Sequence, residues 1–129
     1  MSKPLPLRSQ LGRLYERIGG EAKLAEILNA FYLTLSQDTL IGFFFDGKDL
    51  SAIASRQKEF LMRAMGASPS YAGKPPAAAH AALPPILAGH FDRRLRILED
   101  VLSKHGVEAE DIRTWVTFEE SFRPAVQKA

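Results

Sequence analysis

The chain has 129 residues, 46% of them hydrophobic and 25% charged, which is the composition of an ordinary single globular domain. It has no cysteine, and this excludes a disulfide scaffold, a thiolate nucleophile and any metal site built on cysteine. The formal net charge is only +2, and acidic residues are spread among the basic ones, so we expect no nucleic-acid partner. No apolar run is long enough to span a membrane and the first residues lack a secretory leader, so we expect a cytoplasmic protein without membrane contact.

Apolar residues recur at helical spacing along the whole chain, and no stretch alternates apolar and polar residues as a half-buried strand does. We therefore predict an all-α fold of about six helices, with a flexible tail over residues 1–10 and one domain over residues 11–129. In chain order, the pattern predicts helices over residues 11–18, 21–36, 49–65, 77–83, 90–106 and 109–126, with a turn-rich piece over 38–45 and a loop over 67–76.

Glycines and capping residues mark several ends of these helices. Gly19 and Gly20 separate the first helix from the second. Asp49 or Ser51 is a candidate N-cap for the third helix, and Gly66 follows its last residue.

Three polar residues stand where the helical pattern predicts apolar ones: Tyr32, Gln57 and His80. A buried polar group without a partner costs about 1–3 kcal/mol, so each of the three needs a partner inside the protein. Each also has an ordinary structural explanation: a tyrosine hydroxyl bonded to a backbone carbonyl, a glutamine bent toward solvent, a histidine satisfied in the core. On periodicity alone, both interpretations stay open.

The charged residues of the last two long helices are expected to face solvent. Arg93, Arg94 and Arg96 have acidic residues among them, which is typical of a solvated helix face. Glu119 and Glu120 stand together on the last helix and are interpreted in the same way.

The order of several short motifs resembles that of the truncated, two-over-two haemoglobins, and most of all that of their group I members. The motifs are, in chain order, LYERIGG over residues 14–20, Phe31-Tyr32, Phe44-Phe45 before Asp46-Gly47, Gln57 with Phe60, Tyr71-Ala72-Gly73, His80 and His90-Phe91-Asp92. The resemblance extends over about residues 11–127. It implies a globin-like fold, a truncated two-over-two helical sandwich, in a monomer or weak dimer.

The resemblance implies a non-covalently held haem b and gives several residues a position around it. His80 stands at the family's proximal position, where its imidazole would bind the iron. Tyr32 and Gln57 match the distal tyrosine and glutamine, on the side where a gas binds. Ile53 stands where some relatives place a histidine, and since isoleucine cannot ligate iron, no second protein ligand is expected from that position.

Further residues are implied to contact the cofactor. Phe45 matches the aromatic residue that packs on the porphyrin, and Phe60 resembles the one beside the apolar gas tunnel. The residues that match positions near the haem propionates are Arg56, Tyr71 and Lys48. The implied lining is completed by apolar side chains, namely Phe43, Phe44, Leu50 and Phe91.

A protein of this kind would bind O2, CO and NO at ferrous iron, with Tyr32 and Gln57 as hydrogen-bond donors to the gas. A hydrogen bond to a charged acceptor contributes about 1.5–3 kcal/mol, enough to slow the loss of O2 about tenfold or more. Oxygen held that firmly favours chemistry over delivery, and the resemblance implies conversion of NO to nitrate with an external reductase as electron donor. Two alternatives stay open: a haem-based gas sensor or redox partner, and a helical interaction module without haem.

The chain departs from the family pattern after His80. The stretch from His80 to residue 91 is about one residue longer than is typical and contains two consecutive prolines. His90 therefore remains a second candidate for the iron ligand, although the spacing from Tyr71 favours His80.

Overall fold

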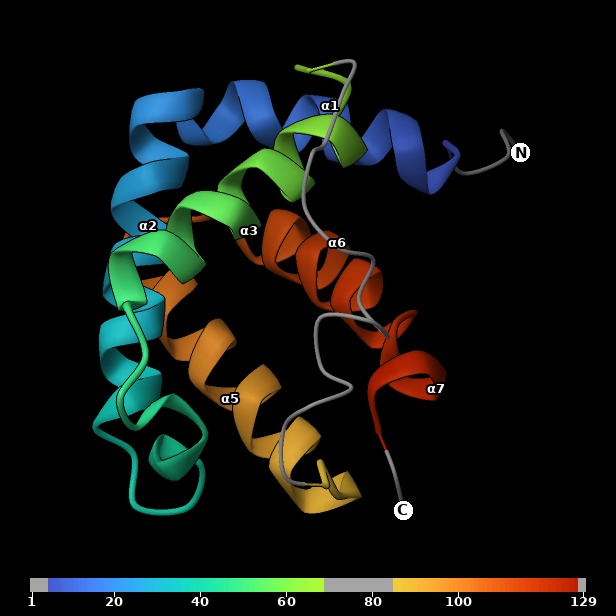
Figure 1. The fold of residues 1–129 in the computed structure, drawn as a ribbon. Helices are drawn as coiled ribbons and strands as arrows, with labels where there is room; N and C mark the ends of the chain where they lie inside the picture. The colour runs from blue at the N-terminus through green and yellow to red at the C-terminus, as the bar shows by residue number, and fades with distance from the viewer. Residues whose placement is uncertain (1–4, 69–84, 128–129) are drawn as a thin grey trace.

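In the computed structural model, residues 5–68 and 85–127 are described, and every regular element within these ranges is a helix. The all-α prediction is thereby confirmed. In chain order (Figure 1) the elements are α1 (Leu7–Ile18), α2 (Glu21–Ser36), the short 3₁₀ helix η1 (Gly42–Phe45), α3 (Leu50–Ala64), α5 (Ala88–Lys104), α6 (Ala109–Glu120) and α7 (Arg123–Val126). Within the described ranges, no helix is both long and apolar enough to cross a membrane.

The longer helices form two packed pairs, α2 with α3 and α5 with α6, and α1 lies across one end of both (Figure 1). This is the two-over-two arrangement. The helices close on one core because each has apolar residues three and four positions apart, which share one face. The least exposed large side chains come from all five of these helices: Leu14, Leu24, Ile27, Leu28, Phe31, Leu35, Leu61, Leu98, Leu102 and Trp115.

Two of the predicted helices agree closely with the structure. The helix predicted over residues 21–36 has the same bounds in α2. It follows Gly19 and Gly20, which adopt φ values of 109° and 81° that other residues rarely reach. Asp49 is the N-cap of α3, because its Oδ1 accepts a hydrogen bond of 3.1 Å from the amide of Ala52.

Two other helices differ from the prediction. The sequence predicts a tail over residues 1–10, but residues 7–10 form the first turn of α1, where the Pro6 carbonyl accepts from the amides of Ser9 and Gln10. The helix predicted over 109–126 is divided into α6 and α7, because Pro124 has no amide hydrogen and its ring excludes a continuous helix. The helix predicted over 77–83 lies outside the described residues, as does most of the loop predicted over 67–76.

The start of η1 lies directly against the end of α2. A Cβ atom at Gly42 would stand 2.6 Å from the carbonyl oxygen of Ser36, which is backbone and cannot turn aside. We expect Gly42→Ala to lower the free energy of unfolding by about 1–3 kcal/mol, since η1 must move away from α2. The matched control is Gly89→Ala on α5, where a Cβ meets no atom within 4 Å and should be neutral or stabilising. Urea unfolding measures both variants. If the two unfold at the same urea concentration, the close contact at Gly42 does not contribute to stability.

Asp38 ties the loop before η1 to α5. Its Oδ1 accepts from Nε and Nη2 of Arg93 at 3.0 and 2.7 Å, and its Oδ2 accepts from the amides of Leu40 and Ile41. The hydrogen bond from Arg93 holds the pKa of Asp38 below its usual value, against the effect of burial. The Arg93 side chain keeps 41% of its surface exposed, as a solvated helix face predicts, but it is tied to Asp38.

This pKa shift predicts how stability depends on pH. The pKa of Asp38 is lowered in the folded state, so the ionised carboxylate stabilises the fold. This contribution to the free energy of unfolding is fully present above the unfolded-state pKa of about 4, and it is lost as the pH falls through the folded-state pKa. We expect Asp38→Asn to be less stable than the unmodified chain at pH 7, because an amide nitrogen cannot accept from the backbone amides. The difference should shrink steadily below pH of about 4. Urea unfolding at a series of pH values measures it, and a difference that stays constant down to pH 2 would contradict the assignment.

Candidate functional site

Tyr32 lies on the buried face of α2, with 6% of its surface exposed. Its ring contacts two other aromatic rings: that of Phe31 at a centroid distance of 5.2 Å and that of Phe45 at 6.0 Å, edge to face. Phe45 itself is half-buried at the end of η1. The sequence placed Tyr32 on the apolar stripe of its helix, and this is confirmed.

Gln57 lies half-buried on α3, and its partner is a carboxylate from the opposite helix pair. The side-chain nitrogen Nε2 of Gln57 donates to Oε1 of Glu119 at 3.5 Å. The Glu119 side chain is only 8% exposed and also accepts from the indole nitrogen of Trp115 at 3.3 Å. The prediction that Glu119 faces solvent is therefore wrong.

Arg94 on α5 carries the charge that balances Glu119. Its Nη1 donates to Oε2 of Glu119 at 2.6 Å, and its guanidinium carbon stands 5.1 Å from the centre of the Phe31 ring. Tyr32 is the other side chain that acts on Arg94. Burial acts to lower the pKa of Arg94, but the charge of Glu119 and the hydrogen bonds to Glu119 and Tyr32 outweigh burial and raise it. The expected solvated face is wrong for Arg94 as well.

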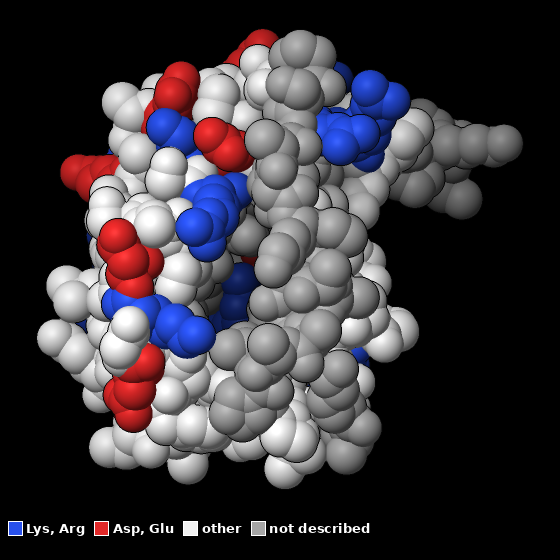
Figure 2. All heavy atoms as spheres, viewed as in Figure 1, with Lys and Arg blue, Asp and Glu red and all other residues white. Residues whose placement is uncertain are grey.

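Five polar side chains from four helices thus form one network, which we call the polar network: Tyr32, Gln57, Arg94, Trp115 and Glu119. The Arg94 side chain remains 23% exposed. Figure 2 shows a hollow on this face of the molecule with a lysine or arginine side chain at its floor. Among the described residues that are not exposed, no buried side-chain nitrogen or oxygen lacks a hydrogen-bond partner. The network is therefore satisfied as it stands.

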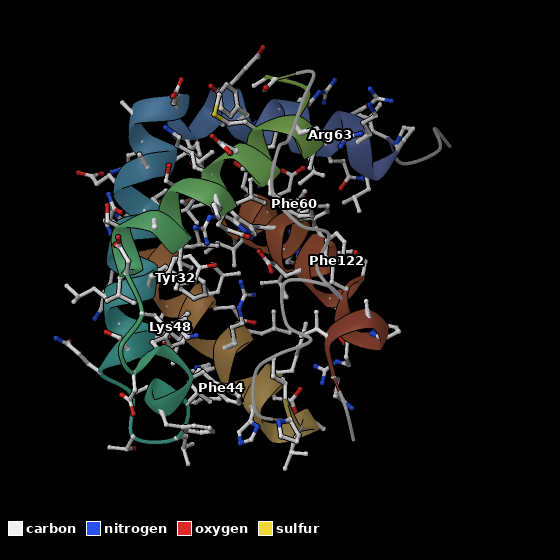
Figure 3. All side chains as sticks on the ribbon, in the orientation of Figure 1. Tyr32, Phe44, Lys48, Phe60, Arg63 and Phe122 are labelled. Carbon is white, nitrogen blue, oxygen red and sulfur yellow. The ribbon has the colours of Figure 1, made fainter. Side chains whose placement is uncertain are left out.

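Apolar side chains line the side of α3 next to the polar network. Ile53 and Phe60 are both half-buried on that helix. The ring of Phe60 stands 6.1 Å from that of Phe118 and 5.5 Å from that of Phe122, and Figure 3 labels Phe60 and Phe122 close to one another. The structure thus places Ile53, Gln57 and Phe60 at helical spacing along α3, and it brings Tyr32 and Phe45 together where α2 contacts η1.

Other residues implied by the resemblance lie at the edges of this region or beyond it. Phe44 is buried and stacks on the exposed Phe43 at 4.1 Å. Leu50 is half-buried at the first turn of α3, whereas Lys48 and Arg56 are exposed.

Phe91 belongs to a separate cluster. It is buried on α5 with Leu95 and Val126, and the guanidinium carbon of Arg123 stands 4.5 Å from its ring centre. The packing of Phe91 against α7 is a structural role that the sequence pattern does not predict.

His90 lies in the first turn of α5, near the start of the helix that the sequence predicts over residues 90–106. Its Nδ1 accepts a hydrogen bond of 3.0 Å from the amide of Leu87, and its ring meets the ring of Phe44 edge to face at 5.2 Å. His80 and Tyr71 lie outside the described residues. Among the residues that are described, no three histidine, aspartate or glutamate side chains form a group that could hold a metal ion.

Glu119 and Arg94 are the residues that sequence reasoning missed. The signal for Glu119 was present, because Trp115 and Glu119 are four residues apart and so share a helix face with Phe118. The partner of Glu119 was not predictable, since Arg94 is 25 residues away on another helix.

Comparison with known proteins gives a consistent result. The family model described as bacterial-like globin matches residues 13–128. A group 1 truncated haemoglobin of Chlamydomonas moewusii is 31% identical over 110 residues, which cover 84% of this chain and 64% of that protein. The crystal structure of truncated haemoglobin from Tetrahymena pyriformis in the Fe(III) form is similar at a TM-score of 0.82 with 26% identity, over 90% of this chain and 98% of that one. The cyanomet 2/2 haemoglobin of Synechococcus sp. PCC 7002, with covalently attached haem, gives a TM-score of 0.78 with 28% identity, over 88% and 96%.

The chain therefore belongs to the bacterial-like globin family. Within it, the similarity is to the group 1 truncated haemoglobins, as the sequence motifs predict. Membership of this family implies a haem protein that binds diatomic gases.

Proposed function

We propose that this chain holds haem b non-covalently and binds O2, CO and NO at its iron, with His80 as the iron ligand and Tyr32 and Gln57 facing the gas. When bound, haem supplies an iron atom that takes a diatomic gas as ligand. The observation that carries the proposal is that Tyr32 on α2 and Gln57 on α3 both adjoin the Arg94–Glu119 ion pair, with Phe45 against the Tyr32 ring and Ile53 one turn before Gln57. Such a mixture is what a small polarised ligand in an apolar pocket requires.

The described residues fit a flat apolar ring. Ile53, Phe45 and Phe60 are only half-buried although they are apolar, and Phe43 is 46% exposed. Covering such surface contributes about 25 cal/mol per Å² removed from water, so an apolar disc against these side chains is favourable. The exposed Lys48 and Arg56 would meet the anionic edge of the disc, where their charges stay in solvent.

Tyr32 and Gln57 would act on the gas as donors. A phenol hydroxyl and a primary amide both carry hydrogens that can be donated to an acceptor bearing negative charge. The side chain of Ile53 has no atom that can bind iron. Residue 53 therefore does not compete with the gas for the iron. We expect a cytoplasmic protein, as a monomer or weak dimer, that needs an external reductase to keep the iron ferrous.

The reaction that this site favours is conversion of NO to nitrate, with O2 as the second substrate and an external reductase as electron donor. Firm retention of O2 by two donors favours this reaction over delivery, which requires easy release. The test is consumption of NO by the oxygenated protein in a stopped-flow instrument, with nitrate measured as product. Consumption no faster than that of the chain without haem would contradict the proposed turnover and leave reversible gas binding.

The cofactor itself is tested by titrating the chain with haemin and recording the visible spectrum before and after dithionite and CO. We expect saturation near one haem per chain, the bands of a haem protein and a shift on addition of CO. A spectrum of free haemin that does not respond to CO would contradict the proposal and favour a helical interaction module.

A further inference from the structure

The polar network contains an ion pair that the stability of the fold does not explain. Arg94 and Glu119 are both largely withdrawn from water, and taking two charges out of water costs several kcal/mol each. Apolar residues of similar volume at such positions are often equally stable or more stable. Stability alone therefore does not account for a charged pair at these positions, and its neighbours in the network point to another role.

One neighbour of the pair is the hydroxyl of Tyr32. A guanidinium has only donors, so toward the neighbouring Arg94 the hydroxyl oxygen of Tyr32 can only accept. The proton of the hydroxyl is then directed to a different acceptor. A hydroxyl that accepts from a cation is also a stronger donor, since hydrogen bonds in series polarise one another.

The other neighbour is the amide of Gln57. An ionised carboxylate only accepts, so Glu119 holds the amide nitrogen of Gln57, and not its carbonyl oxygen, toward itself. Arg94 and Trp115 also donate hydrogen bonds to Glu119, and these bonds keep its carboxylate in place. With a neutral amide at residue 119, which both donates and accepts, Gln57 would be free to turn over.

We propose that Arg94 and Glu119 are positioning residues for the gas-binding side: Arg94 keeps Tyr32 as a donor, and Glu119 keeps the amide of Gln57 in one orientation. The inference deepens the proposed function and rests on it, because Tyr32 and Gln57 meet a gas only if haem is bound. Neither positioning residue needs to touch the gas. The ion pair joins α5 to α6, and through its two neighbours it also reaches α2 and α3.

The test is the double variant Arg94→Met/Glu119→Gln, loaded with haem. Removing both charges avoids leaving one of them buried and unpaired, which would risk unfolding. We expect O2 to dissociate about three- to tenfold faster than from the unmodified protein, which is the loss of about one weakened hydrogen bond. The infrared stretching band of bound CO should also move and broaden, since it reports the polarity beside the gas. Urea unfolding of the ferric protein should show no loss of stability.

The matched control is Arg96→Met/Asp100→Asn, which removes an exposed ion pair from the same helix α5. It should leave the O2 dissociation rate and the CO band unchanged. If the double variant of the polar network keeps both the rate and the CO band of the unmodified protein, the positioning role is wrong. If it loses stability while the CO band is unchanged, the pair is structural and the inference is equally wrong. Failure of the unmodified chain to bind haemin is a separate result, and it overturns the proposed function first.

Discussion

Replacing Tyr32 by phenylalanine is expected to speed the dissociation of O2 at least about tenfold. The hydroxyl is the atom lost, and a hydrogen bond to an acceptor that carries charge contributes about 1.5–3 kcal/mol, which corresponds to a factor of about 10 to 150. The phenyl ring keeps the contacts with Phe31 and Phe45, so the packing of α2 against η1 should survive. Stopped-flow displacement of O2 by CO measures the rate.

The matched control for this variant is Tyr15→Phe, which removes the hydroxyl of a half-buried tyrosine on α1 and should leave the rate unchanged. Gln57→Leu and the double variant Tyr32→Phe/Gln57→Leu complete a mutant cycle. Because both donors act on one ligand, we expect the two single effects not to add. An unchanged O2 dissociation rate in Tyr32→Phe would show that Tyr32 does not donate a hydrogen bond to the bound gas.

Replacing His80 by alanine is expected to abolish tight retention of haem. In the proposed site the cofactor is held by an iron–imidazole bond, by burial of the ring and by the charges of Lys48 and Arg56 at its edge, and this variant removes the first. A ligand of the folded state stabilises it by mass action, by about 2.7 kcal/mol at a hundredfold excess over its Kd, so the melting temperature with haem present should fall by several degrees. Transfer of haem to an apoglobin acceptor and thermal melting measure the two effects.

The chain has two other histidines that serve as controls. His90→Ala removes the acceptor for the Leu87 amide and should cost a little stability while leaving haem retention intact. His105 stands at the far end of α5, with Nδ1 3.7 Å from Glu26, and His105→Ala should leave haem retention intact as well. Loss of haem from His90→Ala together with retention in His80→Ala would exchange the roles of these two histidines.

Much of the fold was predictable because its signals are local. The bounds of α2 follow from an unbroken apolar stripe that begins after two glycines, and the start of α3 follows from Asp49. The division of the last helix was missed although Pro124 was visible, because the apolar period continues through Phe122 and Val126. The early start of α1 rests on the Pro6 carbonyl, for which the side-chain pattern gives no sign.

The candidate site was predicted less completely, for a physical reason. Tyr32 and Gln57 are conspicuous because a polar residue interrupts an apolar stripe. Arg94 and Glu119 are not conspicuous, because a charged residue on a helix is solvated by default and becomes buried only when a partner from another helix meets it. A local pattern cannot reveal a pair separated by 25 residues.

The central claim is that a haem is held between His80 and the side where Tyr32 and Gln57 donate hydrogen bonds. A crystal structure of the haem-loaded chain in its ferric, cyanide-bound form tests it most directly. We expect the His80 imidazole on one face of the ring, and on the other face the Tyr32 hydroxyl and the Gln57 amide nitrogen within hydrogen-bonding distance of the cyanide. An iron bound to His90, or a Tyr32 hydroxyl directed away from the ligand, would contradict the account.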